Sequence, residues 1–195
     1  MNLGRNTVRG IVTAGALAVA TALVPATTTA MAGEAVHGPA AAVAAPTTLV
    51  FDKNPKNPTA STLSVYKGGK LQARYRAGSG TGNTNPCAIG KGWMPNGNWK
   101  IKSRSTRYDG RLIKGYAVYL EDMKCSPSSS KKRTEMFIHS EMNRDGSQGR
   151  TEARRWDGPS DYKSNGCVKL HPNDIKKMFR LLDRIGWPSH LRVVS

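Results

Sequence analysis

The residue whose surroundings best suit chemistry is a cysteine in a short glycine-containing motif. The motif is Ser164-Asn165-Gly166-Cys167, and a run that looks helical opens shortly after it at Pro172. Glycine lets a substrate backbone approach closely, and a backbone N–H beside it can face a developing oxyanion. A free cysteine is mostly un-ionised at neutral pH, so a catalytic one needs a nearby imidazole or the N-terminus of a helix. We therefore expect Cys167 to be a nucleophile with a depressed pKa and Gly166 to contribute an oxyanion contact.

His139 is the best candidate for the base that activates this thiol. It follows the apolar run 136–138, so a strand can present its ring at a sheet edge while the Ser140 carbonyl orients one ring nitrogen. On an extended strand, His171 would lie about 13 Å from Cys167 and out of reach. A histidine at a strand end is also often a surface or core residue, and these residues alone leave that alternative open. The remaining histidines are His37, near the N-terminus, and His190, in a turn near the C-terminus.

No metal or cofactor site is expected from the sequence. Cys167 and His171 have the residue types of a zinc pair, but two further ligands at a suitable spacing are missing. The glycine-rich stretch 78–86 has the composition of a phosphate-binding loop, but Gly90-Lys91 is followed by Gly92 instead of serine or threonine. We interpret this stretch as a flexible connection beside the site.

Taken together, these motifs resemble the catalytic domain of the bacterial L,D-transpeptidase (YkuD-like) family, whose signature is a histidine followed later by Ser/Thr-His-Gly-Cys. The residues that carry the resemblance are Ile138-His139-Ser140, the run 164–170, Met94-Pro95-Asn96-Gly97-Asn98-Trp99, and Leu63-Ser64-Val65-Tyr66 with Lys70-Leu71. The resemblance implies a β-sandwich with a flanking C-terminal helix. It also implies a cysteine acyltransferase that forms 3→3 cross-links between peptidoglycan stem peptides, or an L,D-carboxypeptidase if water is the acceptor.

The sequence departs from the family pattern at two positions of the motif and in one spacing. Asn165 stands in place of the second histidine, and an amide cannot take a proton at neutral pH. Lys169 replaces the usual arginine two residues after the cysteine, which keeps the charge but loses a bidentate grip on a carboxylate. The separation of His139 and Cys167 is also longer than is typical. We expect Ser164, Asn165 and Lys169 to contact the substrate.

The polar segment 141–163 lies between the two candidate catalytic elements and contains Trp156. A long loop in such a place is typical of a lid or substrate wall, so we also expect Trp156 to contact the substrate. The alternative is a disordered insertion without a role in the site.

The elements that position the site are mostly strands. Residues 71–77 alternate between apolar and polar side chains, and 112–120, 136–138 and 191–194 are rich in strand-forming residues. One helix is expected from Pro172 to Gly186, with Ile175, Met178, Phe179 and Leu182 on its buried face. The pattern predicts a β-rich α+β domain.

The N-terminal region has the three-part layout of a secretory signal peptide. Arg5 and Arg9 precede an apolar run from Ile11 to Val24, and Ala30-Met31-Ala32 offers a cleavage site. The run is short for a membrane span, although an uncleaved anchor or a buried helix remains an alternative. We expect a signal peptide at 1–32, a disordered Ala/Pro-rich leader at 33–47, and one catalytic domain at 48–195, secreted or cell-wall associated without a stable membrane anchor.

The formal net charge of +17 predicts affinity for polyanions. For an exported bacterial protein, these would be anionic wall polymers and peptidoglycan carboxylates; the basic residues are scattered, and we expect no specific nucleic-acid partner. The densest cluster, Lys131-Lys132-Arg133, is interpreted as a solvated loop.

The three cysteines are Cys87, Cys125 and Cys167. In an exported protein two should pair, and the loop contexts of Cys87 and Cys125 favour a bridge between them with Cys167 free. Three reduced cysteines, or a bridge that includes Cys167, remain open because connectivity cannot be deduced from sequence.

Two other classes of protein are weighed against an acyltransferase. A papain-like or NlpC-like peptidase needs its histidine well downstream of the cysteine, and the short segment after Cys167 disfavours that order. A non-catalytic basic module that binds the cell wall would explain the charge without needing Cys167.

Overall fold

The structure is a computed structural model that describes residues 44–195. The predicted signal peptide, and the leader up to residue 43, lie outside the described residues. Strand β1 already begins at Thr47, which the sequence assigned to the leader. The strands are β1 Thr47–Asp52, β2 Ser61–Lys67, β3 Lys70–Gly78, β4 Gly97–Asp109, β5 Lys114–Leu120, β6 Met123–Lys124, β7 Lys132–Arg133, β8 Phe137–His139, β9 Val168–Leu170 and β10 His190–Val194. The helix α1 runs Pro172–Ile185, and two short 3₁₀ turns cover Pro58–Ala60 and Pro159–Tyr162.

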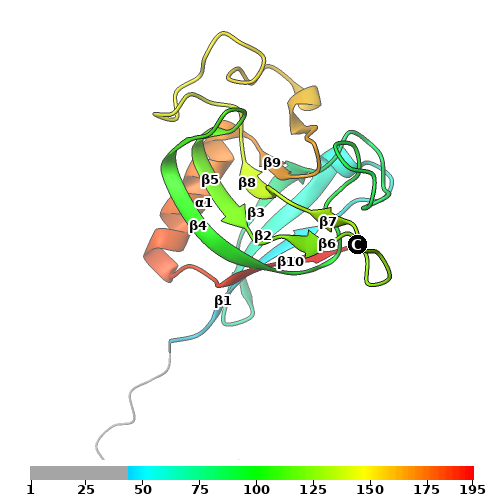
Figure 1. The fold of residues 1–195 in the computed structure, drawn as a ribbon. Helices are drawn as coiled ribbons and strands as arrows, with labels where there is room; N and C mark the ends of the chain where they lie inside the picture. The colour runs from blue at the N-terminus through cyan, green and yellow to red at the C-terminus, as the bar shows by residue number, and fades with distance from the viewer. Residues whose placement is uncertain (1–43) are drawn as a thin grey trace, which may run out of the picture. The chain divides into compact units, whose positions relative to one another are not determined.

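The main sheet closes into a barrel with the strand order β1-β10-β4-β5-β8-β9-β3-β2 (Figure 1). Closure depends on β1, which pairs with β2 antiparallel and with β10 parallel, with Leu49 opposite Leu191. The β-rich α+β class is therefore correct, but the sandwich is not confirmed. The sequence could not reveal the difference, because it depends on pairing between the first and last strands.

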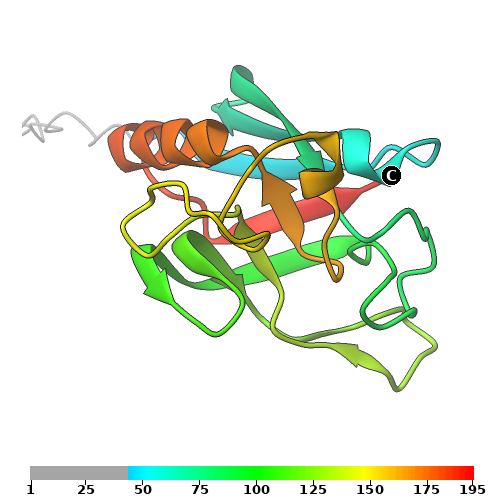
Figure 2. The same cartoon turned by 90° about the horizontal axis from the view of Figure 1, so that it is seen from above.

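The one α-helix among the described residues has the bounds and the buried face that the sequence predicted. His171 caps its N-terminus by accepting a hydrogen bond from Asn173 N–H, and Gly186 ends it at φ 94°, where glycine is favoured. The side chains of Ile175, Met178, Phe179 and Leu182 are buried in the main core. Figure 2 shows the helix alongside the barrel, where the Phe179 ring meets that of Tyr116 at 5.0 Å.

Strand β4 is the longest strand of the described residues, and sequence periodicity did not predict it. Most of its side chains are exposed, including Lys100, Lys102 and Arg104, so it lacks a clear apolar alternation. Its inner face still contributes Trp99, which is fully buried and donates from Nε1 to the Pro95 carbonyl at 3.1 Å. Strands β3, β5, β8 and β10 lie close to the predicted runs, whereas β1 and the short strands β6 and β7 were not predicted.

The barrel interior is a continuous apolar core. Its fully buried members include Leu49, Phe51, Leu63, Leu120, Ile138, Leu170 and Leu191. Ile138 and Leu170 belong to the two short strands that end at the candidate site, so core packing fixes the frame on which that site is built.

A disulfide joins Cys87 to Cys125, as predicted, and leaves Cys167 as the free cysteine. The bridge ties the loop between β3 and β4 to the β6–β7 hairpin, where Cys125 N–H also bonds to the Lys131 carbonyl. Within residues 44–195 no helix has the length and apolar character needed to cross a membrane.

Candidate active site

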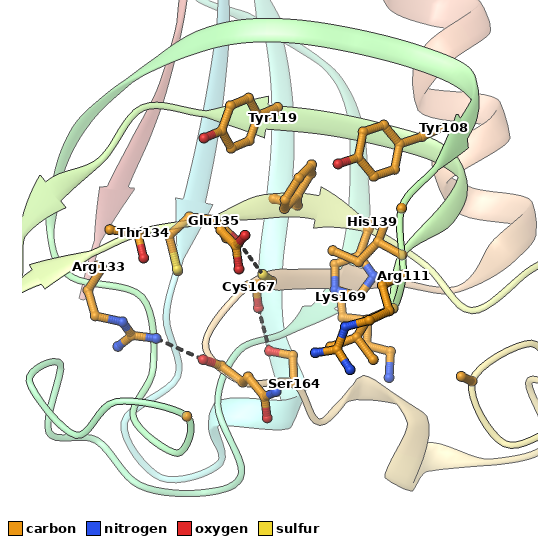
Figure 3. A pocket seen from close by; sticks show the side chains of 18 of the residues that line it. Tyr108, Arg111, Tyr119, Arg133, Thr134, Glu135, His139, Ser164, Cys167 and Lys169 are labelled. Carbon is orange, nitrogen blue, oxygen red and sulfur yellow. Dashed lines mark hydrogen bonds between the residues drawn. The ribbon is translucent and has the colours of Figure 1, made fainter.

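Two adjacent parallel strands bring the candidate nucleophile and base together. In the β8–β9 pair, Ile138 lies opposite Val168 and His139 opposite Lys169, so Cys167 directly precedes β9. Residues two apart on a strand share a face, which puts Cys167 and Lys169 on one side of the sheet. His139 therefore lies diagonally across from Cys167 on the neighbouring strand (Figure 3).

His139 and Cys167 line one cavity of about 850 Å³. Aromatic side chains from Tyr108, Tyr119 and Phe137 form one part of its wall, and the Tyr119 and Phe137 rings lie 4.9 Å apart. The charged residues that line it are Arg111, Lys132, Arg133, Glu135, Glu141, Lys163 and Lys169. Ser140, Ser164 and Asn165 also line it, whereas Gly166 and Trp156 are not among its lining residues.

The His139 ring is held in one tautomer by its neighbour. Its Nδ1 lies 3.1 Å from the Ser140 carbonyl, the contact expected from the sequence. A carbonyl can only accept, so Nδ1 carries the proton and Nε2 keeps the lone pair that a base needs. Burial, helped by the nearby Lys169 charge and opposed by the Ser140 hydrogen bond, lowers the pKa of His139 to about 3. The imidazole is thus neutral at physiological pH.

Cys167 is a protonated thiol, contrary to the depressed pKa expected from the sequence. Its side chain is buried, and Sγ donates to the Glu135 carbonyl at 3.6 Å. Burial raises its pKa to about 11, while a Phe137 backbone hydrogen bond and the Arg133 and Lys169 charges act in the opposite direction. The hydrogen bonds of residues 44–195 include none between Cys167 and His139. The resting pair is therefore neutral thiol and neutral imidazole.

Two serines fix the loop before Cys167: Ser164, which belongs to the loop, and Ser79, which comes from the segment after β3. Ser164 Oγ donates to the Cys167 carbonyl at 2.6 Å and accepts from the Gly80 and Gly166 N–H groups at 3.2 and 3.1 Å. Ser79 Oγ donates to the Gly166 carbonyl at 2.8 Å. The Gly166 N–H is thus engaged, so in this geometry it does not offer the predicted oxyanion contact. Ser164 organises the loop, although it also lines the cavity.

Lys169 does not present a free ammonium to the cavity. Its Nζ pairs with a Glu141 carboxylate oxygen and donates to the Lys163 carbonyl at 2.9 Å. Burial raises the pKa of Glu141, opposed by the Lys169 hydrogen bond and charge. The other carboxylate oxygen of Glu141 and the hydroxyl of Ser140 are buried without a protein partner among the described residues. Substrate contact by Lys169, predicted from the family position, would require this pair to open.

Arg133 is one of the site residues that sequence reasoning missed, together with Glu135, Glu141 and the aromatic wall. The cluster 131–133 was expected to be solvated, but the Arg133 side chain is only 2% exposed and lines the cavity. Its Nη2 donates to the Asn165 carbonyl at 2.8 Å (Figure 3). Lys131 and Lys132 are exposed as expected. Nothing in the local sequence distinguishes Arg133 from its two basic neighbours, because its acceptors come from distant loops.

Trp156 and His171 lie together on a different part of the surface. The Trp156 ring meets His171 at 5.3 Å and Tyr162 at 4.8 Å, both edge to face. His171 is occupied by the helix cap, which agrees with the expectation that it is not the base. The predicted contact of Trp156 with substrate has no support from this arrangement, because the ring packs on these side chains rather than on the cavity.

The segment 141–163 is an ordered wall. Glu141, Ala153 and Lys163 line the cavity, and the buried Asp161 accepts from the Asp157 and Gly158 N–H groups at 2.6 and 2.9 Å. These contacts favour the predicted wall over a disordered insertion. Among residues 44–195 no three His, Cys, Asp or Glu side chains are grouped to hold a metal ion.

A buried thiol and a base-competent imidazole in one cavity, at the ends of two core strands, are the parts of a cysteine acyl-transfer site. Residues 49–186 match the L,D-transpeptidase catalytic domain, designated YkuD, and the chain belongs to that family. No curated protein matches the sequence.

Solved L,D-transpeptidases are similar to this chain at low identity. The enzyme from Enterococcus faecium is 18% identical with a TM-score of 0.45, over 76% of this chain and 50% of that chain. The one from Mycobacterium smegmatis is 14% identical with a TM-score of 0.44, over 76% and 59%. The one from Xylanimonas cellulosilytica is 13% identical with a TM-score of 0.41, over 78% and 62%. The chain thus spans about half to three fifths of the length of these relatives.

Proposed function

We propose that this domain is a cysteine acyltransferase that acts on peptidoglycan stem peptides and forms 3→3 cross-links through a thioester on Cys167. The observation that carries the proposal is that one cavity is lined by the free thiol and by a histidine whose Nδ1 is fixed by the Ser140 carbonyl. Family membership supports the class of substrate. In the donor, the bond cut is the one between the third residue of a tetrapeptide stem and its terminal D-alanine.

His139 acts as a general base because the resting thiol is neutral. Nε2 takes the proton from Sγ as the sulfur attacks the donor carbonyl, and the oxyanion is received by the Cys167 N–H, since the Gly166 N–H is engaged. The imidazolium then gives its proton to the departing D-alanine amine, which leaves a thioester. An acceptor amine attacks the thioester and loses a proton to Nε2, and Sγ leaves and is reprotonated.

The cavity suits an anionic peptide. Three exposed cations, Arg111, Lys132 and Lys163, line it beside the aromatic wall, against one exposed carboxylate from Glu135. A stem peptide carries free carboxylates that such a wall would attract. With water as acceptor, the same site would be an L,D-carboxypeptidase.

Export is part of the proposal. A cleaved signal peptide at 1–32 would deliver the domain to a compartment in which the Cys87–Cys125 bridge persists. The net charge of +15 that remains once Arg5 and Arg9 are removed would add salt-sensitive contact with anionic wall polymers. N-terminal sequencing of protein recovered from the culture medium or wall fraction tests the cleavage.

Mass spectrometry of defined muropeptides tests the activity. The protein is incubated with a tetrapeptide donor alone and then with an added stem amine, beside Cys167→Ala and His139→Ala. We expect an acyl adduct on Cys167 and then a cross-linked dimer; tripeptide with free D-alanine would indicate the carboxypeptidase. Binding to wall material without any Cys167 adduct would assign the domain to the non-catalytic modules.

A further inference from the structure

The Arg133 guanidinium is buried against four backbone carbonyls that come from two separate loops. Nη1 donates to the carbonyls of Pro86 at 2.7 Å and Trp93 at 3.2 Å, and Nη2 to that of Asn165 at 2.8 Å. Both nitrogens also lie 3.4 Å from the Gly92 carbonyl. The planar fork of arginine makes such a multiple contact possible, whereas a lysine ammonium could satisfy only part of it.

This buried cation has no carboxylate partner. The ion pairs formed by residues 44–195 do not include Arg133, and carbonyl dipoles compensate a full charge only in part. Burying an unpaired charge opposes folding. A leucine or methionine of similar size would avoid that cost but would leave the four carbonyls without these donors. The arginine therefore joins the two loops and also brings an unpaired positive charge to the site.

The guanidinium lies directly against the backbone that leads to the nucleophile. Gly166 has φ 111°, and a Cβ there would lie 1.7 Å from Arg133 Nη2. The absence of a side chain at Gly166 thus lets the positive charge reach the residue adjacent to Cys167. Pro86, which accepts the shortest of the Arg133 hydrogen bonds, precedes the bridged Cys87, so the disulfide supports the same arrangement.

Four charged or titratable groups face the Cys167 thiol. Lys169 is paired with Glu141, and His139 is uncharged at rest. Glu135, which follows closely on β7 and has φ 52°, accepts from Sγ through its carbonyl, and its carboxylate opposes ionisation of the thiol. The exposed cations Arg111, Lys132 and Lys163 also line the cavity, but the two cations whose charges act on the Cys167 thiol are Arg133 and Lys169. Of these two, Arg133 is the one without an anion partner among the described residues. Its charge acts to lower the pKa of Cys167, and a Cys167 thiolate acts to raise the pKa of Arg133.

We propose that Arg133 is a positioning residue that holds the Asn165-Gly166-Cys167 backbone in place and provides the counter-charge for the Cys167 sulfur when it ionises. The inference rests on the proposed role of Cys167 as the nucleophile. Arg133 itself donates to backbone carbonyls and need not touch the substrate. Its charge lowers the free energy needed to ionise the Cys167 thiol, which burial raises. The thiol nevertheless stays protonated at rest.

The pH dependence of Cys167 alkylation tests this proposal. Iodoacetamide is added to the non-reduced protein between about pH 6 and about pH 10, and the modified fraction is followed by intact mass. In Arg133→Gln the neutral amide removes the charge, so we expect the rate at each pH in this range to fall by about tenfold or more, as for a pKa raised by about one unit. The charge-matched control is Lys131→Gln, which removes an exposed cation of the same hairpin outside the cavity, and it should alkylate like wild type.

Arg133→Lys separates the effect of the positive charge from the effect of the hydrogen bonds to the loops. It keeps the cation but loses several donors, so we expect a rate within about threefold of wild type. If Arg133 were only a structural brace, both variants would loosen the loop, expose Cys167 and react faster than wild type at every pH. That result overturns the proposal, as does loss of the folded circular-dichroism spectrum in both variants. If only Arg133→Gln fails to fold, the alkylation rate of Arg133→Lys decides: a rate within about threefold of wild type supports the proposal, and a faster rate at every pH overturns it.

This readout is independent of the proposed enzymatic activity. A wild-type protein that forms no acyl adduct with a tetrapeptide would refute the acyltransferase, whatever the alkylation profile shows. A normal adduct together with an Arg133→Gln alkylation profile like that of wild type would refute the role of Arg133 alone.

Discussion

Lys169 and Glu141 form an ion pair between β9 and the start of the cavity wall, with side chains only 8% and 12% exposed. Both groups are largely removed from water, and each has the other as its counter-charge. Loss of one member therefore leaves the other charge buried without a partner. A pair in this position joins β9, the strand that directly follows Cys167, to the segment 141–163, and it therefore couples the two sides of the cavity.

Lys169→Met should lower the free energy of unfolding by about 3 kcal/mol, because it leaves the Glu141 carboxylate without its counter-charge. Glu141→Gln should also destabilise. The double variant should be less destabilised than the sum of the two, as urea denaturation at neutral pH can measure. Strict additivity would contradict the pairing.

His139→Ala should lower turnover of a tetrapeptide donor by about 10²- to 10⁴-fold, since the thiol then lacks a general base. His171→Ala is the matched control, because His171 caps α1 and lies against Trp156 away from the cavity. Steady-state kinetics with both variants checks the expectation. Equal loss in both would mean that the β8–β9 register places the wrong histidine at the site.

Acid should destabilise the wild-type protein through His139. Its pKa is about 6.5 in the unfolded chain and about 3 in the folded one, so between these values only the unfolded state gains a proton. Stability therefore falls as pH falls through this window, by at most about 1.4 kcal/mol per pH unit. His139→Gln should show a shallower decline in urea titrations from neutral pH to about pH 4. Parallel curves for the two proteins would contradict a buried neutral imidazole.

Gly166→Ala should destabilise the fold, because its Cβ would meet the Arg133 guanidinium at 1.7 Å and the Gly92 carbonyl at 2.8 Å. Gly82→Ala is the control: Gly82 has a similar φ of 107°, but a Cβ there would have nothing within 4 Å. We expect the backbone cost of about 1–3 kcal/mol in both variants and a further loss only at Gly166. Thermal denaturation of the two proteins side by side measures the difference.

The features that the sequence predicted well are those encoded within one segment. Helix α1 follows from its apolar spacing with Pro172 and Gly186 at its ends, and the pairing of Cys87 with Cys125 follows from their loop contexts. The contact of His139 with Ser140 involves adjacent residues, so it too could be anticipated.

The features that were missed depend on partners far along the chain. Barrel closure requires β1 beside β10, and burial of Arg133 requires acceptors near residues 86, 93 and 165. The pKa of Cys167 was predicted with the wrong sign because the motif suggested activation by charge, whereas in the folded site desolvation outweighs the nearby cations. Local sequence carries no measure of that burial.

The disulfide also makes the order of events during maturation matter. Three thiols allow three single bridges, and two of these consume Cys167. The native pair is 38 residues apart, and Cys167 follows Cys125 at a comparable distance, so random oxidation of an extended chain has little reason to choose correctly. Cys167 escapes oxidation once β8 and β9 pair and bury it among Ala117 and Phe137. Yield of active protein should therefore depend on folding outpacing oxidation, and a disulfide isomerase would rescue chains that oxidise first.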